Sequence, residues 1–401
     1  MGDFEARHII EALRSGIPSR AVGACFTEAR PAMLKAITNR LEHVQETGLS
    51  DGMIYTGRYG EGKTHLLNTI WSIATTSNMV VSCISLGKET PFDKLHLLYQ
   101  KIIANTYLPG AQQPGFRHKL EMLTPNSAIS GEMLAFSAKE LETDKLYYLF
   151  RALLGTQEEE ETFAFLSDLE GDFTTASLIK KSYKRITGDT ARFNQSFSKT
   201  KHTMDYFRFI SHLFRQLGYD GWVILFDEAE LLGRLSKKAR CKCYCQMHPF
   251  LAQSRKMDSV FSLIAFSSSY VEDVIDKKNE FANIEENFIN DATALTQARN
   301  TLNAIMKAPE LMPLSRTEIG EALLRIQEFH AKAYNWTPQL NADTLLDASE
   351  ESGYLLRTKI RASIELLDQL YQYGEAGKIT ISELGCETFE EDVPALELPE
   401  D

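Results

Sequence analysis

Cysteine is scarce in this chain, with six among 401 residues. So few cysteines in so long a chain exclude the disulfide framework of a small secreted protein. Long apolar runs are missing as well, since none reaches the ~18–20 residues that a membrane helix needs. The first residues, MGDFEAR, lack the apolar stretch of a signal peptide. From these absences we expect a cytoplasmic protein.

An excess of basic residues is also missing. The 43 Lys and Arg face 55 Asp and Glu, which gives a net charge of −12. Seven of these acidic residues fall in the last 15 positions, and without them the charge is −12 + 7 = −5. They are Glu387, Glu390, Glu391, Asp392, Glu397, Glu400 and Asp401. The whole-chain charge gives no support for a dedicated non-specific DNA binder, but it leaves a local basic patch open.

Strands and helices alternate in the pattern of a parallel α/β sheet. Apolar runs predict strands at 52–57, 79–86, 222–226 and 260–266, with a weaker candidate at 311–314. Helical periodicity predicts helices at 7–15, 31–46, 64–75, from Pro91 to Ala104, and at 317–333, and a helical region that ends with 355–373. Between 109 and 220 the pattern is helical only, which indicates an insertion.

These patterns divide the chain into six expected segments. They are an N-terminal helical segment (1–48), the first part of an α/β core (49–108), the helical insertion (109–220), the second part of the core (221–315), a helical lid (316–385) and an acidic, disordered tail (386–401).

A glycine-rich loop is the sharpest motif. Residues 57–64 read GRYGEGKT and fit GxxxxGK[ST], with a predicted strand before the loop and a helix after it. In this motif the backbone N–H groups cradle phosphates, the lysine reaches the β- and γ-phosphates and the hydroxyl binds Mg²⁺. We expect Lys63 to be catalytic and Thr64 to be a metal ligand. The expected ATP contacts are Gly57, Arg58, Tyr59, Gly60, Glu61, Gly62, Lys63, Thr64 and His65.

Two carboxylates follow the apolar strand at 222–226. At the carboxyl end of a parallel strand, Asp227 would hold Mg²⁺ through water and Glu228 would polarise the water that attacks the γ-phosphate. An acidic helix cap is the alternative. The strand at 260–266 ends in three serines, of which Ser268, or Ser267 next to it, would position the water or the γ-phosphate. A serine-rich turn is the alternative there.

Together these motifs resemble the AAA+ ATPases, especially the origin-recognition and initiator-like clade. The opening segment 6–20, ARHIIEALRSGIPSR, resembles the ATP-binding proteins of BREX-type phage-defence loci. The resemblance implies an AAA+-like P-loop fold, with a parallel sheet flanked by helices and a C-terminal helical lid. It also implies that Ile17 or Pro18 packs on the adenine near Arg20, where an ordinary helix stop is the alternative. In the lid, Arg357, or else Arg361, would touch the γ-phosphate.

One departure from the AAA+ pattern concerns arginine. Ring-forming members supply an arginine to the neighbouring subunit's nucleotide from the segment after the polar strand tip, yet residues 257–298 contain none. A lysine would replace it only in part, because an ammonium lacks the bidentate fork. The candidates that remain are Lys277, Lys278, Arg299, Arg255 and Arg240.

Two further features leave alternatives open. Cys241, Cys243 and Cys245 precede His248, but the CxCxC spacing is not that of a zinc site, so we expect a helix surface, with zinc or redox chemistry as the alternatives. Two basic clusters would contact nucleic-acid phosphates or simply solvate a helix. They are Arg234, Lys237, Lys238, Arg240 and Lys242, and Lys180, Lys181, Lys184 and Arg185 around Tyr183.

The motifs thus predict an Mg²⁺-dependent ATPase, and the resemblance implies that it acts as a switch or loader in prokaryotic anti-phage defence. Its expected partners are other defence proteins, such as helicase, nuclease or methyltransferase components, together with double-stranded DNA and further copies of the chain. The alternatives are a hydrolysis-poor ATP-binding scaffold and an initiator-like DNA loader outside defence.

Overall fold

The computed structural model describes residues 2–15, 19–26, 30–350 and 356–376. Their contacts form two compact units, each made of separate pieces of the chain. One consists of Met1–Arg30, Tyr59–Asn68 and Met312–Asp401, and the other of Pro31–Arg58 and Thr69–Leu311. We call them the helical unit and the sheet unit. Among the described residues, no helix has the length and apolar character needed to span a membrane.

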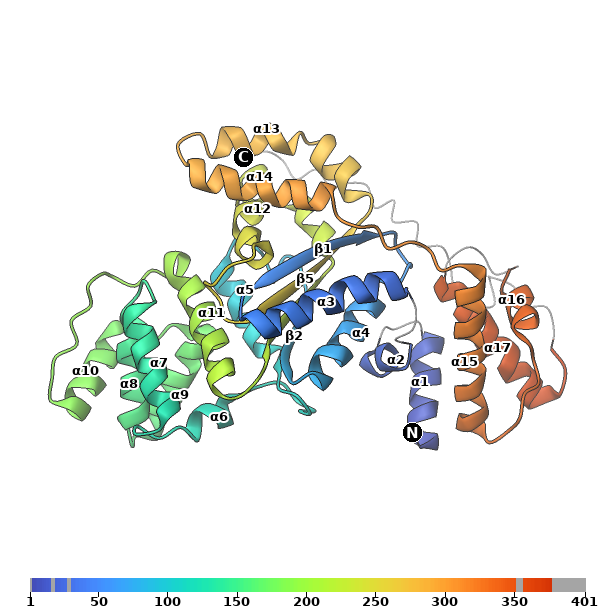
Figure 1. Cartoon of the computed structure of the whole chain (residues 1–401), viewed down its shortest axis with the longest axis horizontal. Helices are drawn as coiled ribbons and strands as arrows, with labels where there is room; N and C mark the ends of the chain where they lie inside the picture. Colours follow the sequence, from blue (N-terminus) through green and yellow to red (C-terminus); the bar gives the residue numbers. More distant parts are fainter. Residues whose placement is uncertain (1, 16–18, 27–29, 351–355, 377–401) are drawn as a thin grey trace. The chain divides into compact units, whose positions relative to one another are not determined.

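The sheet unit is built on five strands in the order β1-β5-β4-β2-β3 (Figure 1). The four long strands run parallel, and β3 pairs antiparallel with β2. Their bounds are β1 Asp51–Gly57, β2 Met79–Ser85, β3 Thr106–Tyr107, β4 Gly221–Asp227 and β5 Val260–Ser267. The four predicted strands are confirmed, whereas β3 was not predicted, because two residues carry no detectable alternation.

The register brings the ends of the four parallel strands to one edge. Gly57 of β1 pairs with Ser267 of β5, and Asp227 of β4 pairs with Ser85 of β2. Since the strands are parallel, this is the carboxyl edge, where α/β sheets bind ligands.

The fifth predicted strand, 311–314, is wrong. Only Glu310 forms a bridge to the sheet, opposite Thr56 on the outer edge of β1. The Thr56 amide donates to the Pro309 carbonyl and the Leu311 amide to the Thr56 carbonyl. The run stops there because Pro313 has no N–H with which to continue the ladder.

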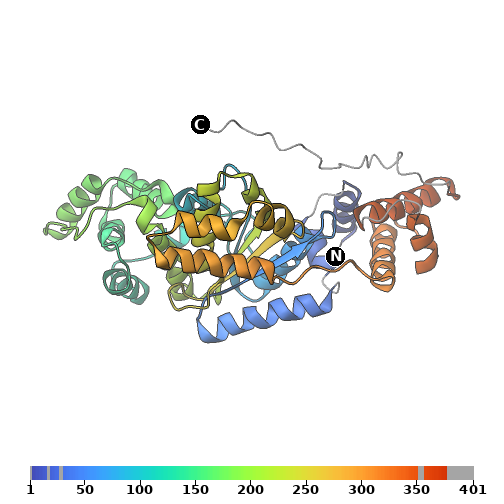
Figure 2. The same cartoon turned by 90° about the horizontal axis from the view of Figure 1, so that it is seen from above.

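Helices flank this sheet. Helix α3 contacts β1 and β5, as does α12, whereas α11 packs on β4 and α5 on β2 (Figures 1 and 2). The helices and helical turns of this part are α3 Pro31–Thr47, α4 Lys63–Thr76, α5 Leu95–Ala104, α11 Lys199–Gln216, η2 Ala229–Arg234, α12 Lys237–Leu251, η3 Val271–Asp276, α13 Glu280–Asn287 and α14 Ala292–Met306. Aromatic rings fill the core beneath β4, where Phe226 lies 5.2 Å from Phe92 and 5.9 Å from Phe250, centroid to centroid.

The predicted insertion is helical, and its helices gather on the far side of α11 (Figure 1). They are α6 Arg117–Glu121, α7 Ala128–Lys139, α8 Lys145–Gly155, α9 Glu159–Ser167, the π-helical turn η1 Asp168–Asp172 and α10 Ala176–Thr187. A buried ion pair joins them, since Lys145 Nζ lies 2.6 Å from Asp168 Oδ2 and 3.0 Å from the Tyr206 hydroxyl of α11. This buried pair therefore joins α8, η1 and α11 within the core of the sheet unit.

The helical unit has a core of its own, made from both ends of the chain. Helix α1 packs on α15 and α17, and α16 also packs against α15 and α17. Arg14 at the end of α1 forms two hydrogen bonds to the Asp368 carboxylate of α17, at 2.9 and 2.8 Å. The helices are α1 Asp3–Ser15, α2 Arg20–Cys25, α15 Arg316–Tyr334, α16 Ala342–Glu350 and α17 Leu356–Tyr373. The contacts thus group residues 1–30 of the predicted N-terminal segment (1–48) with the predicted lid, whereas α3 belongs to the sheet unit.

Candidate functional site

The glycine loop has the backbone that its motif requires. The chain leaves β1 at Gly57 and enters α4 at Lys63. Gly60 and Gly62 have φ of +79° and +88°, a region that side-chain-bearing residues rarely adopt. Lys63 is 9% exposed at the first position of the helix, where backbone N–H groups have no helical partner and attract anions. Arg58 and Tyr59, by contrast, are exposed.

Arg30 is part of the site, and the sequence analysis missed it. Its Nη2 donates to the Glu61 carbonyl at 2.6 Å and its Nε to the Met312 carbonyl at 3.0 Å, so one guanidinium joins the apex of the glycine loop to the segment that leads into α15. The Arg30 side chain is 9% exposed, and its φ is +58°. No local motif marks this arginine, because both acceptors are backbone atoms far away in the sequence.

Helix α2 is pressed against the beginning of α4. A Cβ added at Gly23 would lie 2.6 Å from the Asn68 Cβ, so only glycine fits there. His65 Nε2 lies 3.4 Å from the Phe26 carbonyl, and burial lowers the pKa of His65. Arg20 is exposed at the first residue of α2. The predicted adenine contacts Ile17 and Pro18 lie outside the described residues.

The two lid arginines have different surroundings. The Arg357 guanidinium carbon lies 5.9 Å from the ring centroid of Tyr59, on the glycine loop. Arg361 Nε donates to the Arg14 carbonyl at 2.8 Å, where it caps the end of α1. Of the two, Arg357 is the one that the structure brings to the loop.

The carboxylate strand ends in an unusual backbone. Asp227 is buried, and its Oδ1 accepts from the Glu228 amide at 2.9 Å. Glu228 is exposed and adopts φ +57°, ψ +35°. A left-handed non-glycine residue costs about 1–2 kcal/mol, and such strain concentrates at functional sites. An ordinary helix cap would place Glu228 in extended backbone instead.

The serine tip of β5, Ser267 to Ser269, is held by hydrogen bonds to the end of β1 and to the segment after β4. The Ser268 amide donates to the Gly57 carbonyl at 3.2 Å, and the Ser267 amide donates to Glu230 Oε2 at 3.1 Å. Ser267 and Ser269 hydroxyls lie 3.1 Å apart. Glu230 was not predicted to belong to the site. Its position two residues after Glu228 is the only feature of the sequence that connects it with the carboxylate pair.

The cysteine cluster is not on a helix surface, so that prediction is wrong. Cys241 and Cys243 are fully buried because α12 lies between α14 and the sheet, which covers both of its faces. Burial raises the pKa of the Cys241 and Cys245 thiols to about 11, and it raises the pKa of Cys243 as well, which opposes thiolate chemistry. The described residues contain no group of three or more His, Cys, Asp or Glu side chains arranged to hold a metal ion.

The candidates for a trans-acting arginine differ in access. Arg240 is excluded, both for that role and for nucleic acid, because it is buried in an ion pair with Glu280 at 2.6 Å. Arg299 is half-exposed and pairs with Glu285 at 2.6 Å. Lys278 donates to a backbone carbonyl, Lys277 pairs with an aspartate and Arg255 is exposed.

Within the two basic clusters that were candidates for nucleic-acid contacts, Lys237 and Arg185 also have carboxylate partners, whereas the lysines of α10 are exposed.

Comparison with known proteins bears on the role of this site. No curated protein matches the chain. The model of one protein family, described as BREX system ATP-binding protein BrxC/D, matches residues 3–123 and 144–381. The matched ranges include the glycine loop, Arg30, both carboxylates, the serine tip and α17. The chain therefore belongs to the family of BREX system ATP-binding proteins, which supports an ATP-binding role in a BREX defence system.

Proposed function

We propose that the chain hydrolyses ATP and uses the hydrolysis as a switch within its defence system. The observation that carries the proposal is the strained backbone of Glu228, which holds an exposed carboxylate at the carboxyl edge of the sheet directly after the buried Asp227. A protein that only bound ATP would gain nothing from this strain. A general base, in contrast, needs a carboxylate held in one orientation.

The residue types fit ATP and Mg²⁺. The left-handed glycines and the helix start at Lys63 suit a phosphate chain. The Thr64 hydroxyl and the Asp227 carboxylate are hard oxygen ligands of the kind that Mg²⁺ binds, and bound Mg²⁺ would neutralise phosphate charge. In our proposal Glu228 accepts a proton from the attacking water, Ser268 orients that water or the γ-phosphate, and Arg357 bonds the γ-phosphate.

The helical unit is the proposed reporter of the nucleotide state. Arg357 on α17 contacts the loop residue Tyr59, and Arg30 joins the loop to Met312, where the chain enters this unit. Loss of the γ-phosphate would remove the differential interaction that favours one arrangement of these helices. Other defence proteins, and duplex DNA contacted by exposed lysines such as those of α10, are the proposed recipients of the signal.

A hydrolysis-poor scaffold is the second candidate. Residues 257–298 contain no arginine, and Arg240 is buried against Glu280. Ring-type stimulation of hydrolysis by a neighbouring subunit therefore has few candidate residues left. Membership of the BREX family argues against a loader outside defence.

The test compares steady-state ATP turnover by the wild type, Glu228→Gln and the control Glu272→Gln, with and without duplex DNA. Glu272 is a suitable control because it is an exposed glutamate in the same unit and has no role in the proposed mechanism. We expect Glu228→Gln to bind ATP as the wild type does but to lose at least about 100-fold in turnover, with the control unchanged. ATP binding without turnover in every protein would instead support the scaffold.

A further inference from the structure

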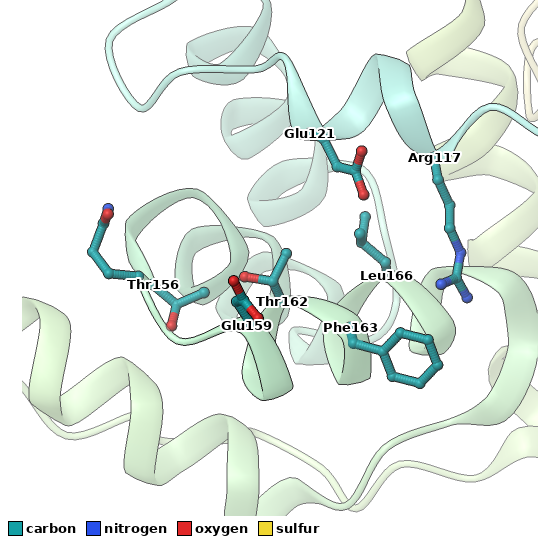
Figure 3. A pocket seen from close by; sticks show the side chains of 8 residues that line it. Arg117, Glu121, Thr156, Glu159, Thr162, Phe163 and Leu166 are labelled. Carbon is teal, nitrogen blue, oxygen red and sulfur yellow. The ribbon is translucent and has the colours of Figure 1, made fainter.

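We propose that a groove on the helical insertion docks a basic, apolar segment of a partner protein. The groove lies between α6 and the α8–α9 connection, within the sheet unit (Figure 3). It is a cavity of about 360 Å³, lined by Arg117, Glu121, Thr156, Gln157, Glu159, Thr162, Phe163 and Leu166. None of these residues belongs to the glycine loop or the carboxyl edge, so the proposal stands apart from ATP hydrolysis.

An exposed aromatic ring forms one end of the groove. Phe163 is 63% exposed, and the Arg117 guanidinium carbon lies 5.0 Å from its ring centroid. Figure 3 shows both side chains at one end of the groove and Thr156 at the other. Leaving a phenylalanine ring exposed is unfavourable in proportion to its uncovered apolar area, and aromatic residues are enriched in protein-binding surfaces.

The ring is held in place before any partner arrives. Arg117 Nε donates to Glu170 Oε1 at 2.6 Å, and its Nη2 donates to the Ser167 hydroxyl at 3.0 Å and to Glu170 Oε2. This clamp fixes the guanidinium that stacks on Phe163. A pre-organised aromatic anchor loses little conformational entropy on binding, and such anchors supply much of the energy of protein interfaces.

The charge around the groove decides the kind of partner. Arg117 is neutralised by Glu170, whereas Glu159 and Glu160 have no ion-pair partner among the described residues. Glu121 and Glu158 are also exposed here, and Glu158 lies 4.0 Å from Arg185. The rim is therefore acidic.

An acidic rim beside an exposed aromatic ring selects lysine or arginine next to a large apolar residue. Nucleic-acid phosphates and anionic membrane headgroups have the wrong sign. The chain's own last 15 residues also have the wrong sign, since seven of them are acidic. The remaining occupant is a cationic, amphipathic segment of another protein.

The experiment places a photo-crosslinking amino acid at Phe163 in the full chain, produced in cells that carry the neighbouring defence genes, and identifies the crosslinked peptides by mass spectrometry. The matched control places the same amino acid at Phe4, which is 84% exposed in another part of the chain. A second variant combines the crosslinker with Glu159→Lys and Glu160→Lys. Its thermal unfolding midpoint, compared with that of the wild type, reports whether it folds.

We expect crosslinks at position 163 to a single segment of another protein that carries net positive charge and apolar residues. The double charge reversal should reduce the yield about tenfold or more, because like charges would then face each other. Three outcomes would overturn the proposal: crosslinks to a second copy of this chain, crosslinks to a neutral or acidic segment, or a yield no higher than at position 4. Undiminished crosslinking by a folded charge-reversal variant would overturn it too.

Discussion

Arg30→Ala tests whether the arginine that the sequence did not reveal controls the glycine loop. The substitution removes two hydrogen bonds from a charged donor, at 2.6 Å to the Glu61 carbonyl and 3.0 Å to the Met312 carbonyl. A hydrogen bond to a charged group contributes about 1.5–3 kcal/mol. Only the bond to Glu61 orders the loop directly. We therefore expect ATP to bind about 10- to 100-fold more weakly, because 1.4 kcal/mol corresponds to a factor of ten.

The assay is equilibrium titration with a fluorescent ATP analogue, together with thermal unfolding. Arg40→Ala is the matched control, since Arg40 Nη1 also donates to a backbone carbonyl, that of Gly52 at 2.8 Å, at the opposite end of β1. Arg30→Lys should restore only part of the affinity, because one ammonium lacks the fork that spans two carbonyls. An Arg30→Ala affinity within about twofold of the wild type, or an equal loss in Arg40→Ala, would refute the reasoning.

Three further predictions concern strain, burial and protonation. Glu228→Gly should abolish turnover yet raise the free energy of unfolding by up to about 1 kcal/mol, because glycine tolerates the left-handed backbone; a destabilised variant in chemical denaturation would contradict this. Lys145→Met should cost about 3–5 kcal/mol by leaving Asp168 buried without its cation, and adding Asp168→Leu should recover much of it; a loss below about 1 kcal/mol for the single variant would count against the pair. Burial holds the pKa of His65 below that of the unfolded chain, so stability should fall as the pH drops below about 6.5, where the unfolded state binds the proton first. His65→Asn should flatten this dependence in thermal unfolding followed from about pH 7 to 5, and an unchanged slope would sink the assignment.

The glycine loop and the central strand could be predicted from the sequence because each depends on local chemistry. The glycine loop is recognisable because phosphate binding needs glycines at fixed spacing before a helix start, and Gly60 and Gly62 have the positive φ that this implies. The strand at 222–226 is recognisable because a strand buried on both faces must be apolar throughout. Both signals lie within a few consecutive residues, so no knowledge of the remaining chain is needed.

Burial on the second face of a helix escaped sequence reasoning. The apolar pattern of α12 indicates one buried side, but α14 covers the other side and buries Cys241 and Cys243 together. The same packing buries Arg240 with Glu280, 40 residues away. Helical periodicity reports a contrast between faces, and a helix covered on both sides offers little contrast.

The sequence by itself determined which residues of the loop, the carboxylate pair and the serine tip are candidates for the site, because each is a short motif of a few consecutive residues. Only the tertiary structure decided the strand order that places β5 between β1 and β4, the pairing of Glu230 with the Ser267 amide, and the bonds from Arg30 to two distant carbonyls. In each of these hydrogen bonds one partner is a backbone atom that any residue carries. Which backbone atom lies within reach depends on how the whole chain folds, and no local side-chain pattern predicts that.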